Sequence, residues 1–375
     1  MGDSKYFALF DRAERRRSCV IARTGAERRA LDRLVGRGLI VRPRTSLFCR
    51  RAYWQKLDPI ARHVHVVRAL QALHPDWAFC RTTAACVFGL PVPYGACRTI
   101  HVVSQTGSRT DARSDVARHT IRGDRSVVVK GIRVTSLART AFDCARSLPF
   151  PEALAIADDA LRRLGWPPGR LDSVFASIGN GLAGVERARC VAAYADPSSE
   201  SGGESIARGR MIEDGFQLPY LQVPFDRPDG RGTYRVDFLW RLPSGEAVIG
   251  ELDGARKYVD PRMANGRSPI RRLAAEQHRE SALTLYRIPI LRISYREATC
   301  PPALIRKLTT YGIPRDPVPC FGPRARRLTP DERRLVSLLS DAGLPLPGCV
   351  SGKRVLWRPP QRGDATPLSL PSNRI

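Results

Sequence analysis

Three acidic residues interrupt two apolar segments between residues 234 and 254. Asp237 lies within the first segment, and Glu251 and Asp253 lie within the second, after a Pro-Ser-Gly turn. The two-residue alternation of side chains on either side of this turn predicts a β-hairpin. An ionised carboxylate in a half-buried strand needs a cation, a partner or a raised pKa. Three such carboxylates in one hairpin therefore predict a metal site.

The hairpin also constrains how these carboxylates are arranged. We expect Val236 and Phe238 on one face of the first strand and Asp237 on the other, and we expect Glu251 and Asp253 to share a face. A register that sets Asp237 opposite or diagonal to Glu251 would bring the two carboxylates within reach of one Mg²⁺ ion. The alternative is an ordinary hairpin with acidic residues on its solvent face.

These residues resemble the PD-(D/E)xK nuclease superfamily, in the branch of very-short-patch-repair endonucleases. Asp237 matches the acidic residue of the first strand, and Glu251-Leu252-Asp253 matches the (D/E)-x-K of the second, with Asp253 in the place of the usual lysine. Glu204 matches an upstream helical glutamate. The resemblance implies a restriction-endonuclease-like, three-layer α/β/α core with a mixed sheet over residues 204–313.

The resemblance extends downstream of the hairpin. Lys257, followed by a tyrosine, matches a Lys-Tyr pair of this branch, and residues 276–281 resemble its charged helix, in which Gln277 and Ser281 depart from the pattern. The implied reaction is hydrolysis of DNA by a water activated on Mg²⁺ or Mn²⁺, with Asp237, Glu251 and Asp253 as metal ligands. Lys257, Arg279 or Asp253 would orient the water or stabilise charge on the phosphate. The candidate catalytic residues are Asp237, Glu251, Asp253, Lys257, Glu204, Arg279 and Glu280.

The charge of the chain points to the same partner independently. The 62 lysines and arginines exceed the 36 acidic residues and give a net charge of +26, as is typical of proteins that bind nucleic acid. The sequence has no apolar run long enough to span a bilayer and no signal-peptide pattern, so we expect no membrane partner and a cytoplasmic, nucleoid-associated protein. Ten scattered cysteines without a CxxC pair predict core thiols rather than a zinc site.

The N-terminal segment predicts a DNA-binding domain over residues 1–60. Thr24 and Glu27 have the spacing of a helix capping box, and two short apolar strands follow the predicted helix. Helix, strand, turn and strand is the order of a winged helix, and the segment resembles the winged-helix domain of AbiEi-type antitoxin regulators. The resemblance implies DNA contacts from five arginines: Arg28, Arg29, Arg33, Arg42 and Arg44.

The remaining segments complete a multidomain α+β and α/β organisation. Residues 61–194 resemble the α+β middle domain of the AbiEi-type family, in which Arg139 and Asp143 have the spacing of a helical ion pair, Thr135 or Ser136 is expected to cap that helix, and Pro151–Leu164 forms another helix. We expect a linker over residues 195–203, and a basic, proline-rich and largely disordered tail over residues 314–375.

Two classes of function remain open from the sequence. The first is a metal-dependent DNA endonuclease that is targeted by its winged helix. The second is a DNA-binding transcriptional regulator, similar to an antitoxin, whose nuclease-fold domain is catalytically inactive. DNA is the expected partner in both cases, and a toxin or a repair protein would be a further partner.

Overall fold

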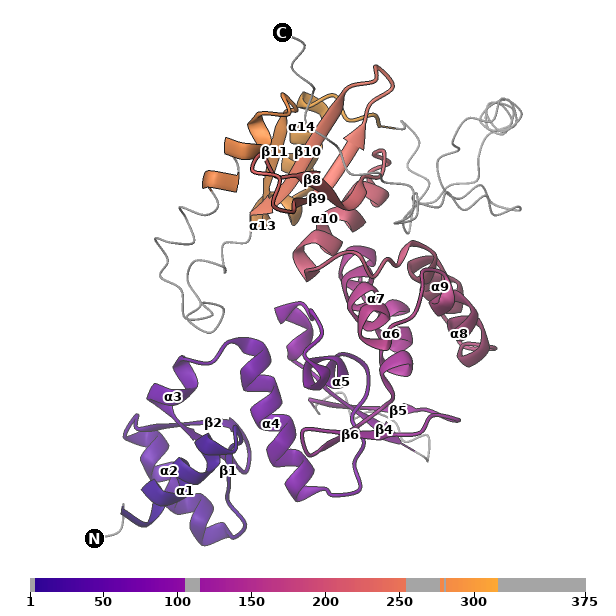
Figure 1. Cartoon of the computed structure of the whole chain (residues 1–375). Helices are drawn as coiled ribbons and strands as arrows, with labels where there is room; N and C mark the ends of the chain where they lie inside the picture. Colours follow the sequence, from indigo (N-terminus) through magenta and orange to yellow (C-terminus); the bar gives the residue numbers. More distant parts are fainter. Residues whose placement is uncertain (1–3, 105–114, 254–276, 280, 316–375) are drawn as a thin grey trace. The chain divides into compact units, whose positions relative to one another are not determined.

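The computed structural model describes residues 4–104, 115–253, 277–279 and 281–315. They form a mixed α and β structure with several sheets (Figure 1). The described residues of 1–148 and 171–189 make a first compact unit, and those of 149–170 and 190–375 make a second. These units divide the chain at other positions than the expected 61–194 domain and 195–203 linker.

The first unit begins with a small helix and sheet module. Its elements are α1 (Ser4–Arg15), β1 (Val20–Ile21), α2 (Gly25–Gly36), β2 (Ile40–Arg44), β3 (Leu47–Arg50) and α3 (Arg51–Gln55). The three strands form an antiparallel sheet in the order β1-β3-β2. Thr24 caps α2 by accepting from the backbone N–H of Glu27, and the Glu27 carboxylate accepts from the backbone N–H of Thr24. The capping box predicted at this position is confirmed.

The rest of the first unit surrounds the buried helix α5. Its elements are α4 (Pro59–Leu73), α5 (Arg81–Phe88), the 3₁₀ turn η1 (Tyr94–Cys97), β4 (Ile100–Ser104), β5 (Val116–Thr120), β6 (Val127–Val129), β7 (Ile132–Val134) and α6 (Leu137–Ala145). Strands β4 and β5 pair in parallel, and β6 and β7 pair antiparallel. Ser136 caps α6, and Arg139 pairs with Asp143 at 2.8 Å, so both predictions for this helix are confirmed. Two further helices are α8 (Arg170–Ile178) and α9 (Val185–Tyr194). Residues 171–189 belong to the first unit, so α8 lies almost entirely in it, and α9 is divided between the two units.

The second unit is built on one four-stranded mixed sheet. Its elements are α7 (Phe150–Leu164), α10 (Gly202–Glu213), β8 (Tyr220–Asp226), β9 (Thr233–Arg241), β10 (Ala247–Asp253), β11 (Ile290–Ser294), α13 (Tyr295–Ala298) and α14 (Pro301–Thr310). The strand order is β11-β10-β9-β8, in which only β10 and β11 run parallel to each other. Residues of α10 and α14 pack into one buried cluster with the sheet, and Leu283 and Tyr286 pack into another. Apolar packing thus covers both faces of the sheet.

Helix α7 belongs to the second unit because it packs along α10. Arg208 of α10 donates to Asp158 of α7 at 2.8 Å, and both side chains are almost completely buried. A Cβ atom on Gly209 would lie 2.6 Å from the Cα atom of Pro151, so the two helices approach too closely for a larger residue. The helix predicted over Pro151–Leu164 is confirmed, but its partner helix lies 50 residues further along the chain.

The expected alternation of side chains in β9 breaks next to Asp237. Phe238 and Trp240 pack into the cluster formed with α10 and α14, whereas Val236 packs into the other cluster. The expectation that Val236 and Phe238 share a face is therefore wrong. The neighbouring strand is irregular at the same level, because Gln222 has a left-handed backbone conformation with φ of 52° between Leu221 and Val223, which pair with Phe238 and Val236.

Within the described ranges, no helix combines the length and the apolar character needed to cross a lipid bilayer.

The ion pair between Asp158 and Arg208 generates a prediction about stability. Arg208→Ala leaves the buried Asp158 carboxylate without its cation, which typically costs about 3–5 kcal/mol of folding free energy. We expect a loss of this size in urea denaturation followed by circular dichroism. Arg241→Ala is the control, because Arg241 is exposed and surface substitutions usually change stability by less than about 0.5 kcal/mol. Equal losses in the two variants would contradict a stabilising role for the buried pair.

Candidate functional site

The candidate site lies where β9 and β10 separate. The two strands pair from Ala247↔Arg241 to Gly250↔Phe238. The next position would set Glu251 opposite Asp237, but there the Asp237 carboxylate accepts the backbone N–H of Leu252 at 2.8 Å. Strand β10 continues its pairing with β11 on the other side. The register therefore brings Asp237 beside Glu251, which is one of the two arrangements expected for the hairpin.

Helix α10 brings Glu204 to the same place. Ser201 caps this helix by accepting from the backbone N–H of Glu204 at 3.2 Å. The Glu204 carboxylate in turn accepts the backbone N–H of Glu200 at 2.8 Å. These two hydrogen bonds fix Glu204 in the first turn, where it is buried.

Gln222 of β8 links two of the carboxylates and was not predicted from the sequence. Its side-chain amide donates to Glu204 at 3.2 Å and to Asp237 at 3.4 Å. It is 7% exposed, and its left-handed backbone is an uncommon conformation for a residue other than glycine. Strained residues of this kind cluster at functional sites. The signal in the sequence was a lone amide within the apolar segment 220–225.

Burial and the charge of Asp237 raise the pKa values of two glutamates in this site. Burial raises the pKa of Glu251 to about 7, with a further contribution from the negative charge of Asp237, while Arg279 acts in the opposite direction. Burial also raises the pKa of Glu204, again with Asp237 as the second cause. Asp237 thus acts on both glutamates, which indicates that the three carboxylates lie in one electrostatic neighbourhood.

Two arginines pair with the acidic residues of β10. Arg279 donates to the Glu251 carboxylate and to the backbone carbonyl of Arg235, the latter at 3.0 Å. Arg292 of β11 pairs with Asp253 at 2.8 Å and was not predicted as a site residue. Glu251 and Asp253 share a strand, as expected, but each has its own cation.

These contacts bear on the three expected metal ligands. Within residues 4–104, 115–253, 277–279 and 281–315, no group of three or more His, Cys, Asp or Glu side chains is arranged to hold a metal ion. Asp237, Glu251 and Asp253 are therefore not assembled as a three-ligand set. Asp237 and Glu251 remain adjacent, and Mg²⁺ is commonly held by one or two carboxylates together with water and substrate oxygens. The donor set fits that mode of binding.

The expected DNA-contacting arginines fall into two groups. Arg28, Arg29 and Arg33 are exposed on α2, and none of their guanidinium groups has a hydrogen-bond or ion-pair partner among the residues that the structure describes. Arg42 is exposed and pairs with Asp32 at 3.0 Å. Arg44 differs from all of these.

The Arg44 side chain is only 14% exposed and pairs with Asp115 at 2.6 Å. Burial lowers the pKa of its guanidinium, against the raising effect of Asp115. The structure thus places Arg44 within the first unit and not on an open strand edge. Lys257 and Glu280, the other two candidate catalytic residues, lie outside the described residues.

Comparison with known proteins gives a partial likeness. No protein-family model matches the chain. Over 161 residues the chain is 35% identical to two uncharacterized proteins of Mycobacterium tuberculosis, MT2308 of strain CDC 1551 / Oshkosh and Rv2248 of strain ATCC 25618 / H37Rv. The match covers 43% of this chain and 58% of each relative, so the chain spans less than two thirds of the curated relatives it matches.

The raised pKa of Glu251 predicts a pH dependence of stability in the metal-free protein. Because the folded-state pKa of about 7 exceeds the ordinary value of 4.5, the folded chain binds this proton more tightly than the unfolded chain does. The stabilisation is fully present below about pH 4.5 and is lost as the pH rises through 7. Relative to Glu251→Gln, the wild type should lose on the order of 3 kcal/mol across this window.

Urea denaturation at a series of pH values, with a chelator present, measures this difference. Glu246→Gln is the control, since Glu246 is an exposed residue of the turn between β9 and β10. A pH profile that is the same in wild type and in Glu251→Gln would show that Glu251 has no raised pKa.

Proposed function

We propose that the second unit hydrolyses phosphodiester bonds of DNA with the help of a divalent metal ion. The observation that carries the proposal is the convergence of Asp237, Glu251 and Glu204 in one buried neighbourhood, where both glutamates have raised pKa values. Buried carboxylates that repel one another are unfavourable for stability, and such groups concentrate at functional sites. The mixed sheet covered on both faces supports assignment to a restriction-endonuclease-like core.

Each residue has a role in this proposal. Asp237 and Glu251 would hold Mg²⁺ or Mn²⁺, which when bound supplies polarisation of a phosphoryl oxygen and a water of lowered pKa. Gln222 holds Glu204 and Asp237 in place through its amide. Arg279 provides a positive charge beside Glu251, where the negative charge of a scissile phosphate would develop.

The first unit would hold the DNA. Arg29 and Arg33 lie one turn apart on one face of α2, and their guanidinium groups have no partner among the described residues, while Leu31 and Leu34 fix the opposite side of this helix in the core. The hairpin of β2 and β3 follows α2 directly, as a wing does in a winged helix. The net charge of +26 supports a polyanionic partner.

A second candidate function is favoured by the ion pairs of β10. Arg279 pairs with Glu251 and Arg292 pairs with Asp253, so each of these acidic residues already has a cationic partner other than a metal. In this alternative the chain is a DNA-binding regulator, similar to an antitoxin, whose nuclease-like unit binds without cutting. A toxin or a repair protein would then be the second partner.

Nicking of supercoiled plasmid separates the two functions. We expect nicking in Mg²⁺ or Mn²⁺ that falls by more than about 100-fold in Asp237→Ala and in Glu251→Ala, because even outer-shell partners of a metal site are worth about 10–100-fold. Glu246→Ala should retain full activity, since its side chain lies in an exposed turn. Circular dichroism of every variant checks that the fold is retained.

Two results of the nicking assay would contradict the proposed nuclease or its site. Wild-type protein that binds the plasmid but does not nick it in either metal would support the regulator. Nicking that persists in both alanine variants would exclude Asp237 and Glu251 as the site.

The role of α2 is tested by the salt dependence of DNA binding. Arg29→Ala/Arg33→Ala should weaken binding and reduce the slope of log affinity against log salt by about 0.9 for each phosphate that the variant no longer neutralises. Fluorescence anisotropy of a labelled duplex at several salt concentrations measures the slope. Arg122→Ala/Arg125→Ala removes the same charge from exposed positions of the first unit, so an equal effect in both variants would contradict a specific role for α2.

A further inference from the structure

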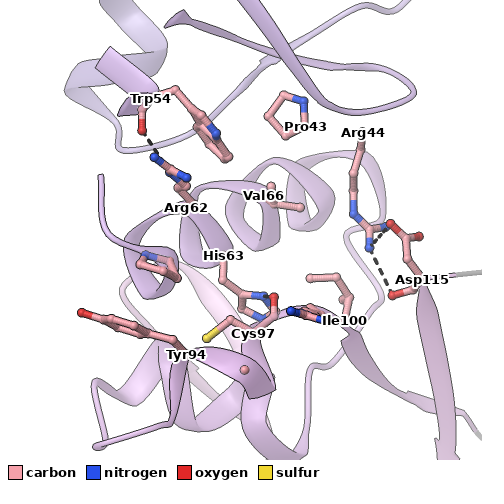
Figure 2. Close-up of a pocket in the computed structure, with 13 residues that line it drawn as sticks. Pro43, Arg44, Trp54, Arg62, His63, Val66, Tyr94, Cys97, Ile100 and Asp115 are labelled. Atoms are coloured by element: carbon pink, nitrogen blue, oxygen red, sulfur yellow. Dashed lines mark hydrogen bonds and ion pairs between the residues drawn. The ribbon is translucent and has the colours of Figure 1, made fainter. Parts of the chain in front are cut away.

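The first unit contains a cavity of about 500 Å³ that is separate from the acidic site. This volume lies within the range of known small-molecule sites. Residues of the β2 end, α3, α4, η1 and the β4 start surround it, together with Asp115 (Figure 2). Its charged lining residues are Arg44, Arg62, Arg98 and Asp115, and Trp54 and Tyr94 contribute aromatic rings.

The charge of the lining is positive. Three arginines face one aspartate, and that aspartate is already paired with Arg44. Arg98 is exposed and has no hydrogen-bond or ion-pair partner among the described residues. The positive charge that remains is therefore carried by Arg62 and Arg98, which favours an anion over a cation or a neutral molecule.

Arg62 is held in a fixed position at the wall of the cavity. Its Nε atom donates to the backbone carbonyl of Trp54 at 3.0 Å, and its guanidinium lies 5.6 Å from the centre of the Trp54 ring. Figure 2 shows these two side chains next to each other, with the Arg44–Asp115 pair on the other side of the view. A guanidinium fixed in this way binds an anion with little loss of side-chain freedom.

The cavity also offers aromatic surface. Trp54 is half-buried, and its indole N–H has no hydrogen-bond partner within the described part of the chain. Tyr94 is 39% exposed, so part of its ring is accessible to a ligand. Nucleobases stack on aromatic rings and on the planes of arginine side chains.

His63 adds to the shape of the cavity but not to its charge. Its ring nitrogens are engaged by the Cys97 carbonyl at 2.8 Å and by the Thr83 hydroxyl at 3.1 Å. Burial lowers its pKa to about 4, so the ring is neutral near pH 7. Its polar atoms are thus satisfied by the protein, and the ligand contacts fall to the arginines and the aromatic rings.

We propose that this cavity binds one unpaired nucleotide, with the base against Trp54 and Tyr94 and the phosphate on Arg62 and Arg98. A simple anion would use the arginines but leave the aromatic surface uncovered, and an apolar ligand would make no use of Arg62 and Arg98. The nucleotide is either free or part of a DNA strand. The inference concerns the first unit alone and holds whether or not the second unit cuts DNA.

Calorimetric titration of the full chain with each of the four 2′-deoxynucleoside 5′-monophosphates, and with inorganic phosphate, tests the free ligand. A single-stranded oligonucleotide of about ten nucleotides, and a duplex of the same length, test the strand. The probe that contains an unpaired nucleotide should bind more tightly than inorganic phosphate, and its binding, unlike that of the duplex to α2, should depend on the cavity residues Arg98 and Tyr94. The variants are Arg98→Glu and Tyr94→Ala, which change exposed side chains.

Both variants should weaken nucleotide binding by about tenfold or more. Arg125→Glu makes the same charge change at an exposed position outside the cavity and should have a smaller effect. Binding of monophosphates that depends on Arg98 and Tyr94 identifies a free nucleotide, and the same dependence for the single strand alone identifies an unpaired base of DNA. Absence of binding by both probes, or equal effects of Arg98→Glu and Arg125→Glu, would overturn the proposal.

Discussion

The hydrogen bond from the Leu252 backbone to the Asp237 carboxylate is the contact on which the second unit depends. Strand β10 pairs antiparallel with β9 only as far as Gly250, but it continues its parallel pairing with β11 to Asp253. A buried N–H without a partner would cost about 1–3 kcal/mol at this point. The carboxylate of Asp237 satisfies it, and by doing so stays beside Glu251. The hydrogen bond at the end of the β9–β10 ladder therefore also positions Asp237 in the candidate site.

The surroundings of Asp237 explain how a basic chain maintains an acidic site. Gln222 donates to two carboxylates, and Arg279 balances a third. These contacts do not offset burial and the repulsion from Asp237, which together keep the pKa values of Glu204 and Glu251 raised. A site with this residual repulsion gains stability from any cation that binds between its carboxylates, and the gain increases as Glu251 loses its proton.

Local patterns predicted much of this structure from the sequence. The capping box at Thr24, the ion pair of Arg139 with Asp143 and the helix over residues 151–164 each depend on neighbours within a few positions, and all three are confirmed. The pairing of Arg44 with Asp115 and the left-handed backbone of Gln222 depend on residues that are distant in the chain. No periodicity encodes such contacts, so the burial of Arg44 and the part played by Gln222 could only come from the coordinates.

Helix α10 carries Glu204 and Arg208 one turn apart, the first in the candidate site and the second against α7. This arrangement matters for anyone who divides the protein into fragments. A fragment that starts near residue 195 would retain Arg208 but lose Asp158, and the freed guanidinium would draw water into the helix that carries Glu204. The shortest fragment of the second unit with an intact acidic site must therefore include α7 and begin no later than Pro149.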